Sequence, residues 1–172
     1  TFVIKSYFLN MSAGTGGSVS ASGSHEHAAQ ATITATPRTG YSFSGWSGDG
    51  ITDLNASTTT VNMTQDRNVS ATFSINRHIL IVSKESGGTA TGSETFDWNS
   101  SAPIVATVNT GYEFTGWTGA GVDHADALST TVAMTQDRNV TASFAQVSVN
   151  KYVLGTFTDP LGSGSTGGGG VY

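Results

Sequence analysis

The residues best placed to hold a metal ion are the two histidines of the segment His25-Glu26-His27. In an extended strand they would share one face, which would bring two imidazole ligands together. A second copy of this segment, described below, has Phe96 and Trp98 at the two positions, so that copy uses the same face for aromatic contacts. Two histidines without a third nearby ligand are usually ordinary polar strand residues, and we predict no metal site.

Segment 48–55 (GDGITDLN) carries oxygen ligands at near-alternate positions, as a calcium-binding loop does. In the second copy Asp49 is replaced by Ala120, and Asp53 by His124. A site that every copy needed would not be lost in the next one. We therefore interpret this segment as a turn built from Asp, Asn and Gly.

Catalysis requires a base held beside a nucleophile, or two carboxylates in one cleft. No histidine recurs in the second copy, and the sequence has neither a Gly-x-Ser-x-Gly motif nor a Walker-type loop. Among the acids only Asp66 and Asp137 recur identically, at a turn where aspartate serves local backbone hydrogen bonds. We predict that the chain is not an enzyme and uses no cofactor.

The elements that carry these residues occur twice. A shift of 71 positions places segment 40–48 (GYSFSGWSG) on segment 111–119 (GYEFTGWTG), and segment 63–69 (MTQDRNV) on an identical one. Between residues 31 and 73, 25 of 43 positions are identical to their counterparts, without a gap. Weaker matches extend to both ends of the chain, so we expect a window from a longer tandem array.

Apolar residues alternate with polar ones in each repeat, as in Ile33/Ala35 and Val61/Met63, which is typical of half-buried strands. Glycine and proline stand between these runs, where turns belong. The corner at residues 65–68 is expected to join the last two strands as a hairpin. We predict an all-β fold, with about five or six short strands in each repeat.

The offset also predicts the domain organisation. We expect a tail of a preceding repeat and a linker at residues 1–7, repeat 1 at 8–74, a linker at 75–78, repeat 2 at 79–145, and a linker with the opening strands of an incomplete third repeat at 146–172. Because the linker between the repeats is short, the array should be an extended, semi-rigid rod.

Most of the recurring apolar and aromatic residues are expected to form the core of each repeat. They are Tyr41, Phe43, Trp46, Val61, Met63, Val69 and Phe73 in the first copy, and Tyr112, Phe114, Trp117, Val132, Met134, Val140 and Phe144 in the second. Trp98 has no tryptophan counterpart in the first copy, which makes it the candidate for a surface contact.

The pattern Gly-Tyr-x-Phe-x-Gly-Trp-x-Gly, followed by Thr-Val-x-Met-Thr-x-Asp-x-x-Val-x-Ala-x-Phe, resembles the divergent relatives of the internalin B-repeat. That module occurs in tandem in bacterial surface and secreted proteins. The resemblance covers nearly all of residues 8–144 and implies a β-grasp-like fold and an extracellular or cell-surface location in a bacterium.

Composition and charge exclude several kinds of partner. Ser, Thr and Gly make up 70 of the 172 residues, cysteine is absent, and the net charge is −5 with seven scattered basic residues. This distribution gives no positive stripe for nucleic acid. No apolar run approaches the roughly 18 residues of a membrane-spanning helix, so we predict no membrane insertion in this segment.

These observations favour a structural and adhesive role as a stalk, spacer or fibre, with neighbouring repeats of the array as the expected partners. Other copies of the chain are a further expected partner, because exposed strand edges pair with other chains and the stretch 162–172 is suited to complete a neighbour's sheet. The alternative is a binding module that presents loops, such as residues 48–57, to a glycan or a host protein.

Overall fold

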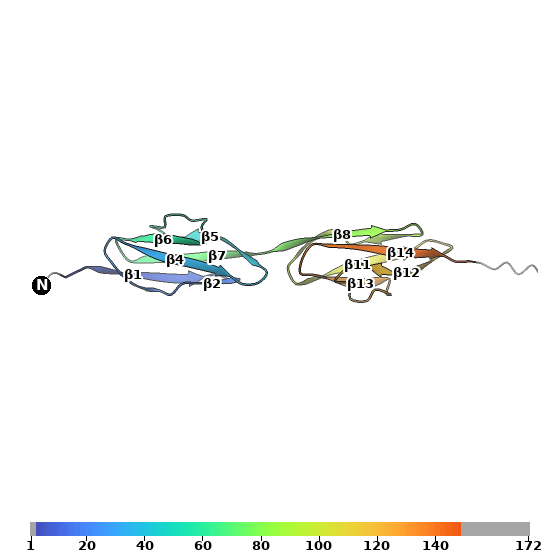
Figure 1. Cartoon of the computed structure of the whole chain (residues 1–172), viewed down its shortest axis with the longest axis horizontal. Helices are drawn as coiled ribbons and strands as arrows, with labels where there is room; N and C mark the ends of the chain where they lie inside the picture. Colours follow the sequence, from blue (N-terminus) through green and yellow to red (C-terminus); the bar gives the residue numbers. More distant parts are fainter. Residues whose placement is uncertain (1–2, 149–172) are drawn as a thin grey trace, which may run out of the picture.

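The computed structural model describes residues 3–148 of the chain. These residues contain 14 β-strands, and none of them forms a helix. Two units of seven strands follow one another along the long axis, joined by an extended segment (Figure 1). Within the described part of the chain, no helix is long and apolar enough to span a membrane.

The strands of the first unit are β1 (Ser6–Ala13), β2 (Gly17–Val19), β3 (Gly23–Glu26), β4 (Ala29–Pro37), β5 (Tyr41–Ser47), β6 (Thr58–Met63) and β7 (Arg67–Ile75). Those of the second unit are β8 (Arg77–Lys84), β9 (Gly88–Thr91), β10 (Glu94–Asp97), β11 (Ser100–Val108), β12 (Tyr112–Thr118), β13 (Ser129–Met134) and β14 (Arg138–Gln146). The all-β tandem fold predicted from the sequence is confirmed.

Each unit consists of two sheets, and consecutive strands always lie in different sheets. The four-stranded sheet of the first unit has the order β3-β1-β7-β5, and the three-stranded sheet has the order β2-β4-β6. The second unit repeats this arrangement, with the orders β10-β8-β14-β12 and β13-β11-β9. Every connection therefore crosses from one layer to the other, and no strand pairs with the next strand in the chain.

The first and last strands of each unit pair in parallel at the centre of the larger sheet. Residues 9–13 of β1 align with residues 67–71 of β7, and β8 aligns with β14 in the same way. The outer strands β3 and β5 pair antiparallel to this central pair. A mixed sheet with this central pair is consistent with the β-grasp-like fold that the resemblance implies.

The core of each unit lies between its two layers. Alternate residues of β4 and β6 point inward from the smaller sheet, and residues of β1, β5 and β7 meet them from the larger one. The buried hydrophobic residues of the first unit are Leu9, Ala31, Ile33, Ala35, Trp46, Val61, Met63, Val69 and Ala71. The second unit has an equivalent and separate cluster. Each repeat thus has its own core.

Two details of the fold differ from the sequence prediction. Each repeat has seven strands rather than five or six, because β2 and β3 contain only three and four residues and are too short for a visible alternation. The predicted hairpin at residues 65–68 is wrong: β6 pairs with β4, and β7 pairs with β1 and β5. Both strands bury alternate residues, but they face each other across the core instead of pairing edge to edge.

The recurring Gly-Trp pair forms a β-bulge in β5. The register shifts between Phe43 and Gly45, where Gly45 has a φ of +149° that favours glycine. The bulge turns Trp46 into the core, and its indole N–H donates to the carbonyl of Ala56 at 2.9 Å. Trp117 makes the same bond to Ala127 at 3.0 Å. Each tryptophan thereby fixes the loop that follows its strand.

Candidate functional site: the repeat junction and the two ends

The feature with the clearest functional content is the junction at which β7 continues into β8. Asn76 is the only residue between Ile75, which ends β7, and Arg77, which begins β8. The chain therefore passes from the larger sheet of one repeat into the larger sheet of the next without a flexible linker (Figure 1).

Asn76 is hydrogen-bonded to both repeats. Its backbone N–H donates to the carbonyl of Gly40 in the first repeat at 2.8 Å. Its backbone carbonyl accepts from the N–H of Trp98 in the second repeat at 2.7 Å. The side chain is held as well, because the Ser42 hydroxyl donates to Asn76 Oδ1 at 2.6 Å. A single residue thus connects the β4–β5 turn of one repeat to the β10–β11 turn of the other.

The indole of Trp98 covers Gly40. A Cβ atom at position 40 would lie 2.1 Å from Trp98 Cε3, which is far inside contact distance. The φ of Gly40 is +81°, and the residue is buried, while the large side chain of Trp98 is half-buried. Only glycine satisfies both the backbone angle and the close approach of the ring.

An exposed ion pair supports the turn that carries Trp98. Arg77 Nε lies 3.2 Å from Asp97 Oδ1, and the Arg77 guanidinium also donates to the carbonyl of Thr95 at 3.1 Å. Both charged side chains are more than half exposed, so the pair contributes little to stability. Beside the junction, β10 is held against β8 by their antiparallel backbone pairing.

The N-terminal end of the first repeat has the same elements as the N-terminal end of the second. Lys5 takes the place of Asn76, and His27 takes the place of Trp98, each shifted by 71 positions. The N–H of His27 donates to the carbonyl of Lys5 at 2.8 Å, as Trp98 does to Asn76. This half of the junction is therefore already formed at the N-terminal end.

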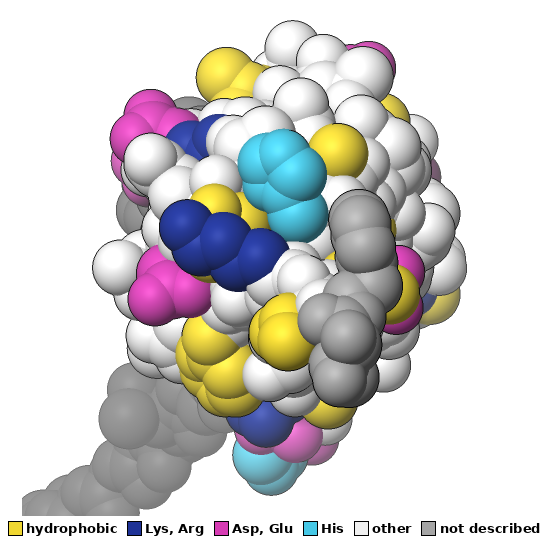
Figure 2. All heavy atoms as spheres, turned by 90° about the vertical axis from the view of Figure 1, so that its left-hand side faces the viewer, with side chains coloured by type: hydrophobic (Ala, Val, Ile, Leu, Met, Phe, Trp, Pro, Cys, Tyr) yellow, Lys and Arg dark blue, Asp and Glu magenta, His cyan; other side chains and the backbone are white. Residues whose placement is uncertain are grey.

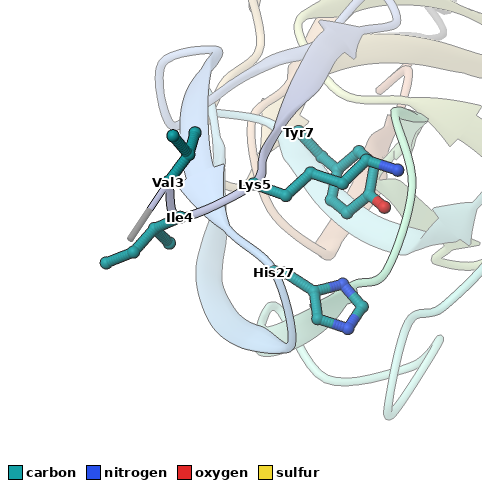
Figure 3. Close-up of a pocket in the computed structure, with 5 residues that line it drawn as sticks. All are labelled: Val3, Ile4, Lys5, Tyr7 and His27. Carbon is teal, nitrogen blue, oxygen red and sulfur yellow. The ribbon is translucent and has the colours of Figure 1, made fainter. Parts of the chain in front are cut away.

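A hollow of about 430 Å³ lies at this end (Figure 3). It is lined by Val3, Ile4, Lys5, Tyr7 and His27. The Lys5 ammonium lies 5.0 Å from the centre of the Tyr7 ring. A hydrogen bond with the Tyr7 side chain raises the pKa of Lys5 above its ordinary value. Figure 2 shows this face, where a basic side chain lies beside a histidine, with apolar and acidic side chains close by.

The C-terminal end of the second repeat has the other half of the junction. Gly111 takes the place of Gly40, and Val147 takes the place of Asn76. The N–H of Val147 donates to the carbonyl of Gly111 at 2.8 Å, which reproduces the Asn76 bond. Gly111 has a φ of +84° but is exposed. Apart from its two neighbours in the chain, no residue of 3–148 has an atom within 4 Å of a Cβ placed on it.

The sequence of both repeats matches a known protein family. The sequence profile described as the divergent InlB B-repeat domain matches residues 7–77 and again residues 78–148. The chain belongs to the divergent InlB B-repeat family. The predicted resemblance is confirmed, and the two matches meet at the junction described above. No curated protein matches the chain in sequence.

The candidate metal ligands lie in the first B-repeat, near its N-terminal end. His25 is on β3, and His27 follows it in the β3–β4 turn. Among residues 3–148 no group of three or more His, Asp or Glu side chains is arranged to hold a metal ion. By the shift of 71 positions, His27 corresponds to Trp98, which contacts Gly40 of the first repeat at the junction.

Loop 48–55 has the geometry of an Asx turn. The N–H of Asn55 donates to Asp53 Oδ1 at 2.8 Å, and the N–H of Asp53 donates to the Thr59 hydroxyl at 3.1 Å. The second B-repeat keeps the latter bond, with His124 donating to Thr130 at 3.0 Å. The loop is thus held by one of its own side chains and by a hydroxyl of β6.

The recurring aspartates have a different role from the predicted one. Asp66 Oδ1 accepts from the N–H of Phe8 at 2.8 Å, and Asp137 Oδ1 accepts from that of Ile79 at 2.9 Å. These partners are 58 residues away in sequence, so the bonds are not local. Because this corner connects the two layers, its carboxylate reaches the first strand of the repeat instead of its own turn.

The predicted core residues fall into two sets. Trp46, Val61, Met63 and Val69 are buried, as are Trp117, Val132, Met134 and Val140. Tyr41, Phe43 and Phe73 are half-buried, as are Tyr112, Phe114 and Phe144. Leu9 and Leu80 are also fully buried; the signal for them was the match between segments 8–9 and 79–80.

Two of the half-buried rings explain the Gly16-Gly17 pair. A Cβ on Gly16 would lie 2.2 Å from the Tyr41 ring, and one on Gly17 would lie 2.2 Å from the Phe73 ring. The second B-repeat repeats both contacts. Packing of an aromatic ring on a glycine therefore recurs within both repeats. The contact of Trp98 with Gly40 is the same kind of packing between the two repeats.

Proposed function

We propose that the chain is a non-catalytic structural and adhesive segment of a secreted or surface-displayed bacterial protein, in which B-repeats form a stalk, spacer or fibre. The observation that supports this proposal most is the junction. Asn76 bonds to both repeats, and Trp98 of one repeat covers Gly40 of the other. Neighbouring repeats are thus held end to end.

The geometry of the junction favours a semi-rigid rod. Bending at Asn76 would lift the indole from Gly40. Each backbone bond would persist within its own repeat, as the equivalent bonds of Lys5 and Val147 do at the outer ends. With about 0.5–1.5 kcal/mol for the loss of the ring contact, the straight state is favoured over the bent one by roughly that amount. Most molecules would then be straight at any moment.

The domain boundaries at 8–74 and 79–145 remain a prediction. So does the alternative of a binding module that presents residues 48–57 to a glycan or a host protein. Assembly through strand edges also remains a prediction, and the stretch 162–172 invoked for it lies outside the described residues. Electron microscopy at high protein concentration tests assembly, because monodisperse short rods would contradict it.

Spin-label distances test the stalk proposal. The chain has no cysteine, so Thr36→Cys with Thr107→Cys gives two unique label sites at exposed, equivalent positions of β4 and β11. We expect one narrow distance distribution. Insertion of two glycines after Asn76 should broaden it severalfold, because the backbone bonds and the ring contact then lose their alignment. A native distribution as broad as that of the insertion variant would refute the rod.

A further inference from the structure

The larger sheet of the first repeat carries a polar groove, which begins on its outer face and continues onto the corner at residues 65–68. Two adjoining hollows of about 500 and 190 Å³ share Ser47, Gly48 and Asn68. The larger hollow is lined by residues 47–49 and 65–68, and the smaller one by residues 10, 12, 47–48 and 68–70. The polar groove formed by these residues therefore crosses the adjacent strands β1, β7 and β5. The larger hollow alone has the size of a small-molecule site.

The side chains of the polar groove can both donate to and accept from hydroxyl groups. Asp49 and Asp66 supply carboxylate oxygens, and Asn10 and Asn68 supply amides; all four residues are exposed. Asn10 Nδ2 donates to Asn68 Oδ1 at 3.1 Å, which orients both amides. The bond uses one of the two N–H groups of Asn10 and none of those of Asn68. A ligand therefore meets polar groups that are already oriented.

An exposed aromatic ring lies beside these polar groups. Side chains alternate between the two faces of β1, and Leu9 is buried, so Phe8 and Asn10 share the outer face. Phe8 is 48% exposed, and its backbone N–H donates to Asp66 Oδ1 at 2.8 Å. A ring next to amides and carboxylates is suited to a sugar, because the C–H face of the sugar packs on the ring while its hydroxyls bond to the polar groups.

The charge of the polar groove favours a neutral ligand. Arg67 is the only basic residue among those that line the two hollows within residues 3–148. Its guanidinium donates to the Thr64 hydroxyl at 3.0 Å, and a Cβ on Gly50 would lie 2.9 Å from its Cζ, so the group is held against its own repeat. The carboxylates of Asp49 and Asp66 would repel a phosphate, a sulfate or a uronic acid.

The second repeat has the same corner without the ring. Residues 136–139 are identical to residues 65–68, and Gly119 takes the place of Gly48. Three positions differ so as to remove the aromatic ring, one amide and one carboxylate. Ile79, Ile81 and Ala120 stand there in place of Phe8, Asn10 and Asp49. The two repeats thus form a matched pair, in which only the first has the full set of groups that a sugar needs.

We propose that the polar groove of the first repeat binds a neutral oligosaccharide, with Phe8 packed against a sugar ring and the amides and carboxylates bonded to its hydroxyls. The inference rests on the adhesive part of the proposed function and deepens it by naming a surface and a class of ligand. It differs from the alternative in which loop 48–57 is presented to a glycan, because most of the polar groove lies on β1, β7 and their corner.

Titration of the whole chain with neutral hexasaccharides tests the proposal. The probes are cellohexaose, maltohexaose and chitohexaose, with hexagalacturonate as the anionic control. Binding is followed by the amide resonances of ¹⁵N-labelled protein. We expect at least one neutral probe to bind, with the largest shifts at the side-chain amides of Asn10 and Asn68. Hexagalacturonate should bind about tenfold more weakly or not at all, because of the two carboxylates.

Substitutions borrowed from the second repeat show where the probe binds. The triple variant Phe8→Ile, Asn10→Ile, Asp49→Ala carries residues that the same fold already accommodates, and it should weaken binding by about tenfold or more. Leu54→Ala removes an exposed side chain of loop 48–57 outside the groove and should leave the affinity unchanged. The reverse triple variant, Ile79→Phe, Ile81→Asn, Ala120→Asp, should create an additional site in the second repeat.

Four outcomes would overturn the inference. They are no binding of any neutral probe, equal or tighter binding of hexagalacturonate, an unchanged affinity in the first triple variant, and no added site in the reverse variant. A loss of binding in Leu54→Ala equal to that in the triple variant would place the ligand on the loop instead. These outcomes leave the spin-label distances across Asn76 unaffected, so a failure here is distinguishable from a failure of the stalk proposal.

Discussion

Trp98 of the second B-repeat lies on Gly40 of the first, so that one residue without a side chain and one with the largest side chain meet between two independent cores. The contact joins the repeats where the chain itself contributes only Asn76. It also provides a matched comparison, because each partner has an equivalent in the other repeat that lacks the contact among residues 3–148.

The first prediction compares Gly40→Ala with Gly111→Ala. Both variants place a Cβ on a residue with positive φ, which costs about 1–2 kcal/mol in each case. Only at position 40 does the new atom collide with the indole, so only Gly40→Ala should displace Trp98 into water. We expect a red shift of tryptophan emission for Gly40→Ala and none for Gly111→Ala. Equal emission spectra would show that the ring does not depend on this glycine.

The second prediction concerns the rings themselves. Trp98→Ala removes the ring from the junction and should broaden the distance distribution between labels at positions 36 and 107. His27→Ala is the control, because it truncates the equivalent residue at the exposed end. The unfolding free energy should change by less than about 1 kcal/mol in the control. If both variants keep the native distance distribution, Asn76 alone sets the stiffness.

The third prediction tests the long-range bond of the recurring aspartate. Asp66→Ala leaves the N–H of Phe8 without its acceptor and should lower the unfolding free energy by about 1–2 kcal/mol. Asp66→Asn retains an oxygen at Oδ1 and should lose less. Asp49→Ala, in an exposed loop, is the control and should be nearly neutral. Urea denaturation measures all three, and equal losses for Asp66→Ala and Asp49→Ala would argue against the bond.

The fourth prediction uses the residue that follows each ring. Ala28 and Asn99 have the same positive φ, which asparagine tolerates better than alanine. Ala28→Asn should therefore stabilise the first repeat by about 0.5–1 kcal/mol, and Asn99→Ala should destabilise the second by a similar amount. Thermal unfolding measures both changes. Shifts of the same sign would show that other contacts dominate at this turn.

Much of the fold could be predicted because the chain contains the same sequence pattern twice, once in each repeat. The alternation of apolar and polar residues in β4 and β6 shows which side chains enter the core. Because the same alternation recurs 71 positions later, it is not a chance pattern. The pairing of strands could not be predicted, because alternation indicates a buried face but not a neighbour. For this reason the prediction of a hairpin at residues 65–68 was wrong. The prediction that Asp66 forms only local hydrogen bonds was wrong as well.

The junction could not be predicted from local pattern either. From the sequence, His27 was a candidate metal ligand. The second repeat has Trp98 at the equivalent position, which argued against a metal site. His27 and Trp98 occupy equivalent positions in the fold but differ in chemistry. Only the structure shows what this position does in the second repeat, where the Trp98 ring contacts Gly40. Sequence alone predicted a short linker, and the structure adds the hydrogen bonds of Asn76 and the contact of the Trp98 ring with Gly40.

The parallel pairing of β1 with β7 determines how a repeat responds when it is pulled. The chain enters at the start of β1 and leaves at the end of β7, so tension draws these neighbours past each other along their length. All hydrogen bonds between residues 9–13 and 67–71 then bear the load together, in shear, instead of opening one after another. An array of such units would yield to force in discrete steps, one repeat at a time, each at the rate at which its central pair ruptures.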